Sequence, residues 1–226
     1  MYNAVILSSR PGWAAESGLA DTLPGLGLSA HQAPWPVAAP AASRGYIVAF
    51  IQLAAGDAAP DPGQLRRAGL SGAIVLTCGT VSAGPPPAHP HLADPVDEGA
   101  LAAALAGAGY VLPLPAGPAI GRHVSQLVDN DPAVTAELIA SLLDTNQSDL
   151  HHFQQACAAQ CWPDVRACAH RIKGTAHMAG AAALAALSQR IETLARQGRG
   201  DTVLALAALY TPAVERLSRT LAALAG

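Results

Sequence analysis

Residues 169–180 read Ala-His-Arg-Ile-Lys-Gly-Thr-Ala-His-Met-Ala-Gly and lie within a long helical pattern. At about 100° per residue, His170 shares one polar face with residues one or two turns away: Arg166, Lys173, Gly174 and His177. The opposite face is the apolar one that a helical bundle would bury, and it comprises Val165, Cys168, Ala169, Ile172, Ala176 and Ala179. The pattern therefore predicts that His170 points outward, away from the core.

The polar face suits phosphoryl chemistry. A neutral imidazole is a nucleophile near neutral pH because its unperturbed pKa is about 6.5, and histidine can carry a covalent intermediate. Lys173, one turn after His170, offers a point charge for a phosphoryl group. Glycine at position 174 destabilises the interior of a helix by roughly 1 kcal/mol relative to alanine. Because glycine has no side chain, it could leave room for the surface of a partner protein. A His-x-x-Lys spacing by itself more often marks a solvated polar face of a helix than a phosphoryl site.

A longer run of residues resembles histidine phosphotransfer (HPt) domains. Residues 169–176 are similar to the A-H-x-[LI]-K-G-[SA]-[AS] core of that family, with Thr175 standing where serine or alanine is commoner. The resemblance covers about residues 118–225 and is strongest to the HPt modules that end hybrid sensor kinases of the virulence-sensor type. The other residues that carry the resemblance are Asp131-Pro132, residues 146–150, Gly180, Leu184, Leu187 and Ile191-Glu192.

This resemblance implies a phosphorelay intermediate. A receiver domain, carrying its own aspartyl phosphate and Mg²⁺, would dock on the face of His170, which would accept the phosphoryl group and pass it to another receiver. Lys173 would offset the charge of that group, and Gly174 would leave clearance for docking. Further docking candidates, each of which could equally be a solvated residue, are Arg166, Arg171 and His177. The chain itself would need no cofactor or metal.

The second half of the chain predicts an all-α antiparallel bundle over residues 119–226. A Pro-rich stretch at 109–118 is expected to be a stiff linker. A long helix should begin with Asp131 as N-cap and Pro132 in its first turn. The other expected helices are 119–127, one starting at Pro163, one at 182–197, and a last one capped by Asp201, kinked at Pro212 and ending near 223.

Residues 1–108 alternate short strands with short helices, which indicates an α/β domain with a doubly wound parallel sheet. The strongest strand is 46–53, a continuous apolar run suited to burial on both faces. Residues 82–90 are rich in proline and are expected to form a loop. The other expected elements are strands at 4–8, 28–32 and 73–77 and helices at 14–23, 64–68 and 97–106.

This first half resembles, in pieces, a response-regulator receiver domain. Residues 73–78 look like its fourth strand ending in the switch threonine, residues 92–96 like Y-L-x-K-P-[IV], and residues 50–54 like D-[IM]-x-[LM]-P. The residues of receiver chemistry are replaced, however. Ser8-Ser9-Arg10 occupies the position of the acidic pair that binds Mg²⁺ in receivers. Phe50 or Ile51 occupies the position of the acceptor aspartate, and Asp94 that of the lysine.

The resemblance therefore implies a degenerate receiver that takes no aspartyl phosphate. The alternative is that residues 1–108 form an unrelated small α/β domain. Such a domain is also expected not to be phosphorylated on aspartate. A different strand alignment would instead place an acceptor at Asp57 or Asp61, just after the strongest strand.

Composition limits the remaining function classes. The 226 residues are 51% hydrophobic and 13% charged, as in a globular protein, and the net charge of −3 gives no basic stripe for nucleic acid. No apolar run approaches membrane-spanning length and no secretory signal is visible, so a cytoplasmic protein without membrane insertion is expected. No kinase ATP-binding signature appears, so autokinase activity is not expected.

Two further alternatives concern the second half. Cys157 and Cys161 lie one turn apart near His151 and His152, but this spacing fits no zinc pattern and is more typical of half-buried thiols. The rival to phosphotransfer is a non-catalytic scaffold, or a phosphoryl sink, that regulates a sensor kinase through protein–protein contacts.

Overall fold

The computed structural model describes residues 1–36, 45–54, 57–80 and 88–225. The chain divides into two compact units, Met1–Tyr110 and Val111–Gly226. At the end of the first unit, the Tyr110 hydroxyl donates to the Leu26 carbonyl at 2.6 Å. At the start of the second, Leu112 is buried and its carbonyl accepts from Arg216 Nη1 at 2.9 Å. The predicted linker at 109–118 therefore includes residues of each unit: Tyr110 belongs to the first and Leu112 to the second.

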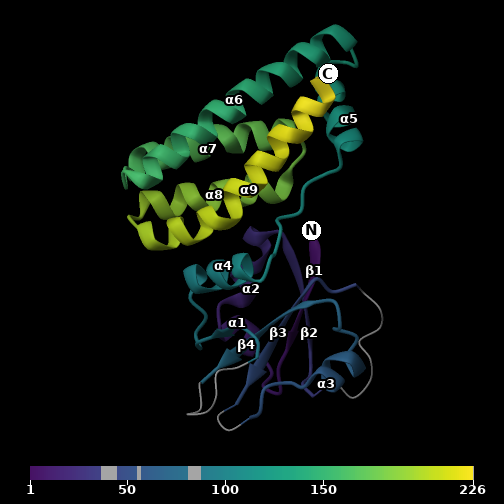
Figure 1. Ribbon diagram of the computed structural model, residues 1–226, viewed down its shortest axis with the longest axis vertical. Helices are drawn as coiled ribbons and strands as arrows, with labels where there is room; N and C mark the ends of the chain where they lie inside the picture. Colours follow the sequence, from purple (N-terminus) through teal and green to yellow (C-terminus); the bar gives the residue numbers. More distant parts are fainter. Residues whose placement is uncertain (37–44, 55–56, 81–87, 226) are drawn as a thin grey trace. The chain divides into compact units, whose positions relative to one another are not determined.

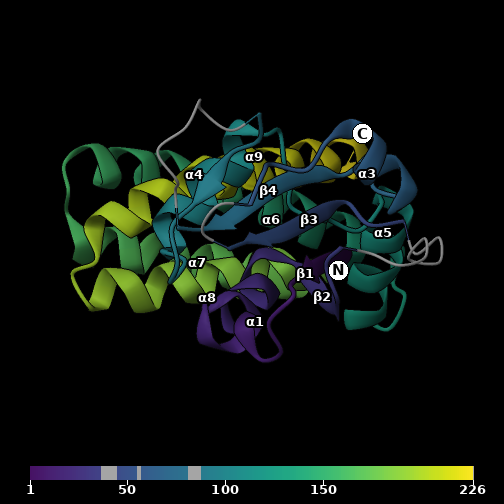
Figure 2. The same ribbon diagram turned by 90° about the horizontal axis from the view of Figure 1, so that it is seen from below.

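The first unit is built on a five-stranded sheet whose strands lie in the order β2-β1-β3-β4-β5 (Figures 1 and 2). Every neighbouring pair is parallel, which confirms the predicted α/β class. An order that reverses beside the first strand is one of the two common doubly wound arrangements. The strands are β1 (Tyr2–Leu7), β2 (Leu28–Ala33), β3 (Val48–Leu53), β4 (Ile74–Gly79) and β5 (His91–Leu92).

The central strands of this sheet are buried on both faces. Successive strand residues point to opposite faces, and residues 4–7 of β1 and 48–51 of β3 are all buried. One face packs with Leu65 and includes Val5, Leu7, Ala49, Ile51, Leu53 and Val75. The other face includes Ala4, Ile6, Val48, Phe50 and Leu76, all of them buried. Continuous apolar strands are what a parallel sheet covered on both sides requires.

The helices of the first unit correct one prediction. A single helix was expected over residues 14–23, but Gly18 has a φ of 81° and separates two short helices. Only glycine adopts this left-handed conformation at little cost, and it interrupts an α-helix. The elements are α1 (Trp13–Glu16), α2 (Leu19–Thr22), the 3₁₀ helix η1 (Leu23–Leu26), α3 (Pro62–Arg67) and α4 (Glu98–Gly107). Most of the predicted loop at 82–90 lies outside the described residues.

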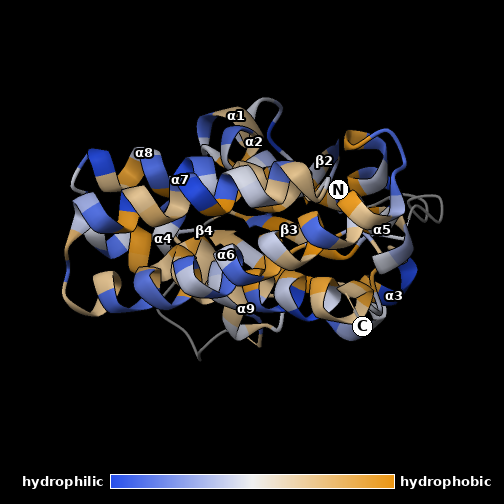
Figure 3. Ribbon diagram, turned by 90° about the horizontal axis from the view of Figure 1, so that it is seen from above, coloured by the Kyte–Doolittle hydropathy of each residue, from blue (hydrophilic) through white to orange (hydrophobic). Residues whose placement is uncertain are grey.

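The second unit is a bundle of four long helices with a short leading one, as predicted (Figure 1). Hydrophilic and hydrophobic residues alternate along the long helices (Figure 3), and buried residues recur along each of them, which is typical of helices that bury one face. Within the described residues, no helix combines the length and the apolar character needed to cross a lipid bilayer. The helices are α5 (Gly117–Leu127), α6 (Pro132–Ala158), α7 (Trp162–Met178), α8 (Ala182–Arg196) and α9 (Gly200–Ala225).

Local sequence explains most helix ends in the bundle. Asp131 caps α6 as predicted, because its Oδ1 accepts from the backbone of Ala133 and Val134 at 2.9 and 3.1 Å. Gly180 and Gly198, with φ of 67° and 69°, follow α7 and α8 and end them.

Two predictions for the last helix are refined by the structure. α9 begins at Gly200, so Asp201 lies in its first turn and is not its cap. Gly200 is required there because a Cβ atom would overlap the ring of Trp162. Pro212 lies inside α9, which continues to Ala225.

Candidate functional site

The α7 helix presents His170 to solvent, as its pattern predicts. All six residues of the predicted apolar face are buried, at 3% exposure or less: Val165, Cys168, Ala169, Ile172, Ala176 and Ala179. The side chain of His170, on the other face, is 70% exposed. Burying the apolar stripe of α7 against its neighbours thus fixes the direction in which His170 points.

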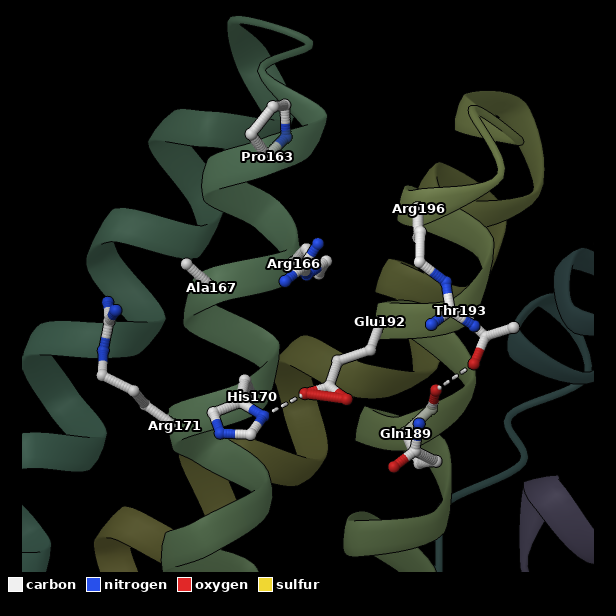
Figure 4. Close-up of a pocket in the computed structure, with 9 residues that line it drawn as sticks. All are labelled: Pro163, Arg166, Ala167, His170, Arg171, Gln189, Glu192, Thr193 and Arg196. Carbon is white, nitrogen blue, oxygen red and sulfur yellow. Dashed lines mark hydrogen bonds and ion pairs between the residues drawn. The ribbon is translucent and has the colours of Figure 1, made fainter.

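One ring nitrogen of His170 is held by the neighbouring helix. Nδ1 lies 2.6 Å from Oε1 of Glu192 on α8 (Figure 4). An ionised carboxylate can only accept hydrogen bonds, so Nδ1 must carry the proton of the neutral ring. The lone pair is then on Nε2, for which no partner is found among the described residues. Glu192 therefore favours one tautomer of the neutral ring, in which the lone pair lies on Nε2.

Glu192 also joins His170 to Lys173. Its Oε2 lies 2.8 Å from Lys173 Nζ, which donates to Gln189 Oε1 at the same distance. Burial alone would raise the pKa of Glu192, but hydrogen bonds from Lys173 and His170, with their charges, lower it below its ordinary value. Glu192 therefore stays ionised at neutral pH, and its charge cancels that of Lys173 in the resting protein.

Gly174 faces open space. A Cβ atom built at this position would have no heavy atom within 4 Å beyond its own helix surroundings. Packing within the bundle therefore does not demand glycine here, although glycine weakens a helix interior.

The three predicted docking residues differ in their surroundings. Arg171 donates from Nε to Asp149 Oδ1 at 2.6 Å, and this hydrogen bond to a carboxylate whose side chain is 6% exposed raises the pKa of Arg171. Arg171 extends away from Glu192 (Figure 4). Arg166 is exposed and lines the same surface depression as His170, whereas His177 is exposed and does not line it. The structure thus brings His170 together with Arg166 but ties Arg171 to α6.

The depression beside His170 has a volume of about 560 Å³ and lies between α7 and α8 (Figure 4). Its lining includes Gln189, Glu192 and Arg196, none of which was predicted as a site residue. These three residues follow helical spacing on one stripe of α8, a signal that places them on one face. That signal does not say which helix they meet. The full lining is Pro163, Arg166, Ala167, His170, Arg171, Gln189, Glu192, Thr193 and Arg196.

The carboxyl edge of the sheet in the first unit is occupied by hydrogen bonds among its own residues. Ser8, after β1, donates to Gln52 at the end of β3. The buried Trp13 donates from Nε1 to Asp94 Oδ2 at 2.8 Å. Phe50 and Ile51, the two positions that the receiver resemblance compares with an acceptor aspartate, are both fully buried.

The alternative acceptor positions also have structural partners. Asp57 accepts from the backbone of Ala54 at 2.8 Å, and Asp61 caps α3 by accepting from the backbone of Gln64 at 2.9 Å. These contacts give Asp57 a backbone partner and Asp61 a capping role.

The cysteine and histidine cluster on α6 and α7 does not form a metal site in the described part of the chain, where no group of three or more His, Cys, Asp or Glu side chains is arranged to hold an ion. Cys157 is buried, and Cys161 donates from Sγ to Asp164 Oδ2 at 3.0 Å. All four cysteines are free thiols.

Comparison with known protein families places a match in the second unit. Residues 137–225 match the family model of the Hpt domain, which supports an Hpt domain within the second unit. These residues include most of α6 and all of α7, α8 and α9. Searches of the curated proteins and of the solved structures gave no match.

Proposed function

We propose that the Hpt domain of the second unit is a phosphorelay intermediate that accepts a phosphoryl group on Nε2 of His170 and passes it to a receiver aspartate. The observation that carries this proposal is the contact of His170 Nδ1 with Glu192, because in the neutral tautomer that it favours the lone pair lies on Nε2 of an exposed ring. The match to the Hpt family supports a role in histidine phosphotransfer.

In the proposed step, the Nε2 lone pair attacks phosphorus on a partner receiver. A bond from Nε2 to phosphorus forms as the bond from phosphorus to the aspartyl oxygen breaks, and the electron pair leaves on that carboxylate. Nδ1 keeps its proton, and Glu192 stabilises the positive charge that develops on the ring. Catalysis by this chain is then positioning and electrostatics, and the Mg²⁺ belongs to the partner.

Lys173 has a conditional role in this proposal. Its ammonium group is 2.8 Å from Glu192 and its side chain is only 18% exposed, so its charge is already matched before the phosphoryl group arrives. Lys173 would help to hold the phosphoryl group by turning its ammonium outward along the flexible stem. Gly174 would provide the space in which the partner's surface approaches.

The first unit is proposed to be a degenerate receiver covering residues 1–108. Its parallel strand order supports this assignment, since receivers share that order. Its carboxyl edge, where receivers carry their acidic site, has Ser8, Gln52, Trp13 and Asp94 joined in pairs. The proposed role is selection of partners through protein contacts, with the chemistry left to residues 119–226.

The proposal is tested with a receiver domain phosphorylated on its aspartate. Label should move to the wild-type chain and to the His177→Gln variant, which keeps His170. The His170→Gln variant should take none. The bound label should be acid-labile and base-stable, as expected of phosphohistidine. Label that survived in His170→Gln would overturn the assignment. A chain that bound the receiver but took no label would favour the scaffold.

A further inference from the structure

Two buried oxygen atoms on α6 have no hydrogen-bond partner among the residues that the structure describes. They are Asn146 Oδ1 and Asp149 Oδ2. Asn146 is fully buried, and Asp149 is 4% exposed. Residues three apart in a helix lie on the same face about one turn from each other, so both side chains enter one stretch of the bundle interior. Burying a polar atom without a hydrogen bond is unfavourable, so these two atoms require a donor.

The amide of Asn146 is oriented by α9. Its Nδ2 donates to the Val214 carbonyl at 3.2 Å and to Ser218 Oγ at 2.8 Å. A carbonyl oxygen can only accept a hydrogen bond, so the amide nitrogen must face α9. The other atom of the amide, Oδ1, is therefore the acceptor that lacks a partner.

The carboxylate of Asp149 is held by α7. Its Oδ1 accepts from Arg171 Nε at 2.6 Å. The guanidinium group stays charged at any physiological pH, and its hydrogen bond favours the ionised form of the carboxyl group. Oδ2 of Asp149 is then an acceptor without a hydrogen of its own. Both unpartnered oxygens therefore need a donor, and neither can donate to the other.

Tyr210 on α9 brings a hydroxyl into the same part of the interior, and its ring lies 5.0 Å from that of Phe153 on α6. Phe153 follows Asp149 by one turn. The hydrogen of this hydroxyl is already used, however. Ser188 Oγ donates to the Leu184 carbonyl at 2.8 Å, so the Tyr210 hydroxyl, 3.1 Å from Ser188 Oγ, must be the donor of that second contact. Tyr210 therefore cannot serve the two oxygens.

The charge of the surroundings selects the missing donor. Asp149 and Arg171 already form an ion pair, so an added cation would be buried without a counter-charge. A water molecule is neutral and has two hydrogens to donate, and buried waters typically bind polar groups that otherwise lack partners. We propose that one water molecule is bound in the interior of the bundle beside α6, where it donates one hydrogen to Asn146 Oδ1 and the other to Asp149 Oδ2.

The bound water completes the hydrogen bonds of a carboxylate that ties α6 to α7. With the water in place, Asp149 is buried as an ion with both oxygens satisfied, and through Arg171 it holds the helix that bears His170. This inference does not rest on the proposed phosphotransfer role. The His170→Gln variant, which cannot take a phosphoryl group at that position, should keep the water.

A crystal structure of the full chain that shows ordered water tests the site without any substitution. Density for one water should lie about 2.6–3.2 Å from both Asn146 Oδ1 and Asp149 Oδ2. A structure in which apolar atoms fill this space, or in which a water contacts only one of the two oxygens, would overturn the proposal.

In solution, ¹⁷O relaxation dispersion counts the waters that stay bound for long times. Asp149→Leu removes one of the two acceptors, and the count should fall by about one relative to wild type because a buried water needs at least two polar partners. Asn146→Leu should give the same fall. Ser218→Ala is the matched control: Ser218 is also buried, but it contacts Asn146 through Nδ2, so the count should not change.

Two results of these solution measurements would contradict the site. Equal counts in wild type and both leucine variants would show that no water is bound there, and a fall in Ser218→Ala would place the water at Ser218 instead. The carboxyl ¹³C shift of Asp149 near neutral pH is a third check and should be that of an ionised carboxylate. A shift typical of a neutral acid would overturn the proposal, because Oδ2 would then carry its own hydrogen.

Discussion

Two regions of the molecule contain a histidine in a hydrogen-bonded network: the face of α7 and α8 around His170, and the carboxyl edge of the sheet in the first unit. The two rings differ in which of their nitrogens have a hydrogen-bond partner. His91 uses both, with Nδ1 3.0 Å from Thr77 Oγ1 and Nε2 3.0 Å from the Gly79 carbonyl. His170 uses only Nδ1 in its contacts with the residues that the structure describes. The carbonyl oxygen of Gly79 can only accept, so Nε2 of His91 is protonated and its Nδ1 accepts from Thr77.

This difference teaches what makes a histidine available for chemistry. Both networks fix a tautomer, but the network at His91 consumes the lone pair whereas that at His170 exposes it. The carboxyl edge of a doubly wound sheet is the usual place for a ligand, and here the polar side chains of that edge bind one another. Three experiments would test or sharpen this contrast, from the largest expected effect to the smallest.

Glu192→Ala should have the largest effect. Without the carboxylate, the ring of His170 can rotate and its proton can move to the outward nitrogen, so the phosphoryl transfer rate should fall by roughly tenfold to a hundredfold. Glu192→Gln should be milder because the amide oxygen can still accept from Nδ1. The measurement is single-turnover transfer from a phosphorylated receiver domain. Equal rates in wild type and Glu192→Ala would show that the contact does not orient the ring.

His91→Ala and His170→Gln should separate the two histidines by stability. Losing His91 leaves the buried Thr77 hydroxyl without its ring partner, which should cost about 1–2 kcal/mol of unfolding free energy. Losing His170 removes an exposed side chain and should stay within about 0.5 kcal/mol. Denaturant unfolding, with hydrogen exchange to localise the change to each unit, measures both. A larger loss from His170→Gln than from His91→Ala would reverse the comparison.

Gly174→Leu should have the smallest effect on the isolated chain. The open space at this position accommodates the side chain, and helix propensity should raise stability by up to about 1 kcal/mol. Transfer from a receiver domain should slow, because the leucine occupies the approach to His170. Transfer from phosphoramidate, a small donor, should not change and serves as the control. Equal slowing with both donors would mean that the leucine disturbs His170 itself.

The sequence predicts features that depend on one element and fails where two must meet. The outward direction of His170 follows from the spacing within α7 alone, and the cap at Asp131 follows from adjacent residues. The contact of His170 with Glu192 joins side chains 22 residues apart on different helices. To predict this contact, one must know the register of α7 against α8. The periodicity of the sequence within each helix does not give that register.

The first unit gives the same lesson at shorter range. Its apolar strands were predictable because continuous burial leaves a continuous apolar run. The break at Gly18 was missed because glycine tolerates both helical and left-handed conformations, and only the surrounding fold selects one. β5 has two residues, too few for any periodicity. The pairing of Trp13 with Asp94, 81 residues away, again depends on tertiary contact.

The most direct test of the central claim is a map of all phosphorylated residues in the full chain after treatment with phosphoramidate and, separately, with acetyl phosphate and Mg²⁺. Mass spectrometry under non-acidic conditions preserves phosphohistidine and locates each label. We predict label on His170 after phosphoramidate, none on His91, and none on any aspartate of residues 1–110 after acetyl phosphate. Label on Asp57, Asp61 or Asp94, or on His91 in preference to His170, would contradict the account.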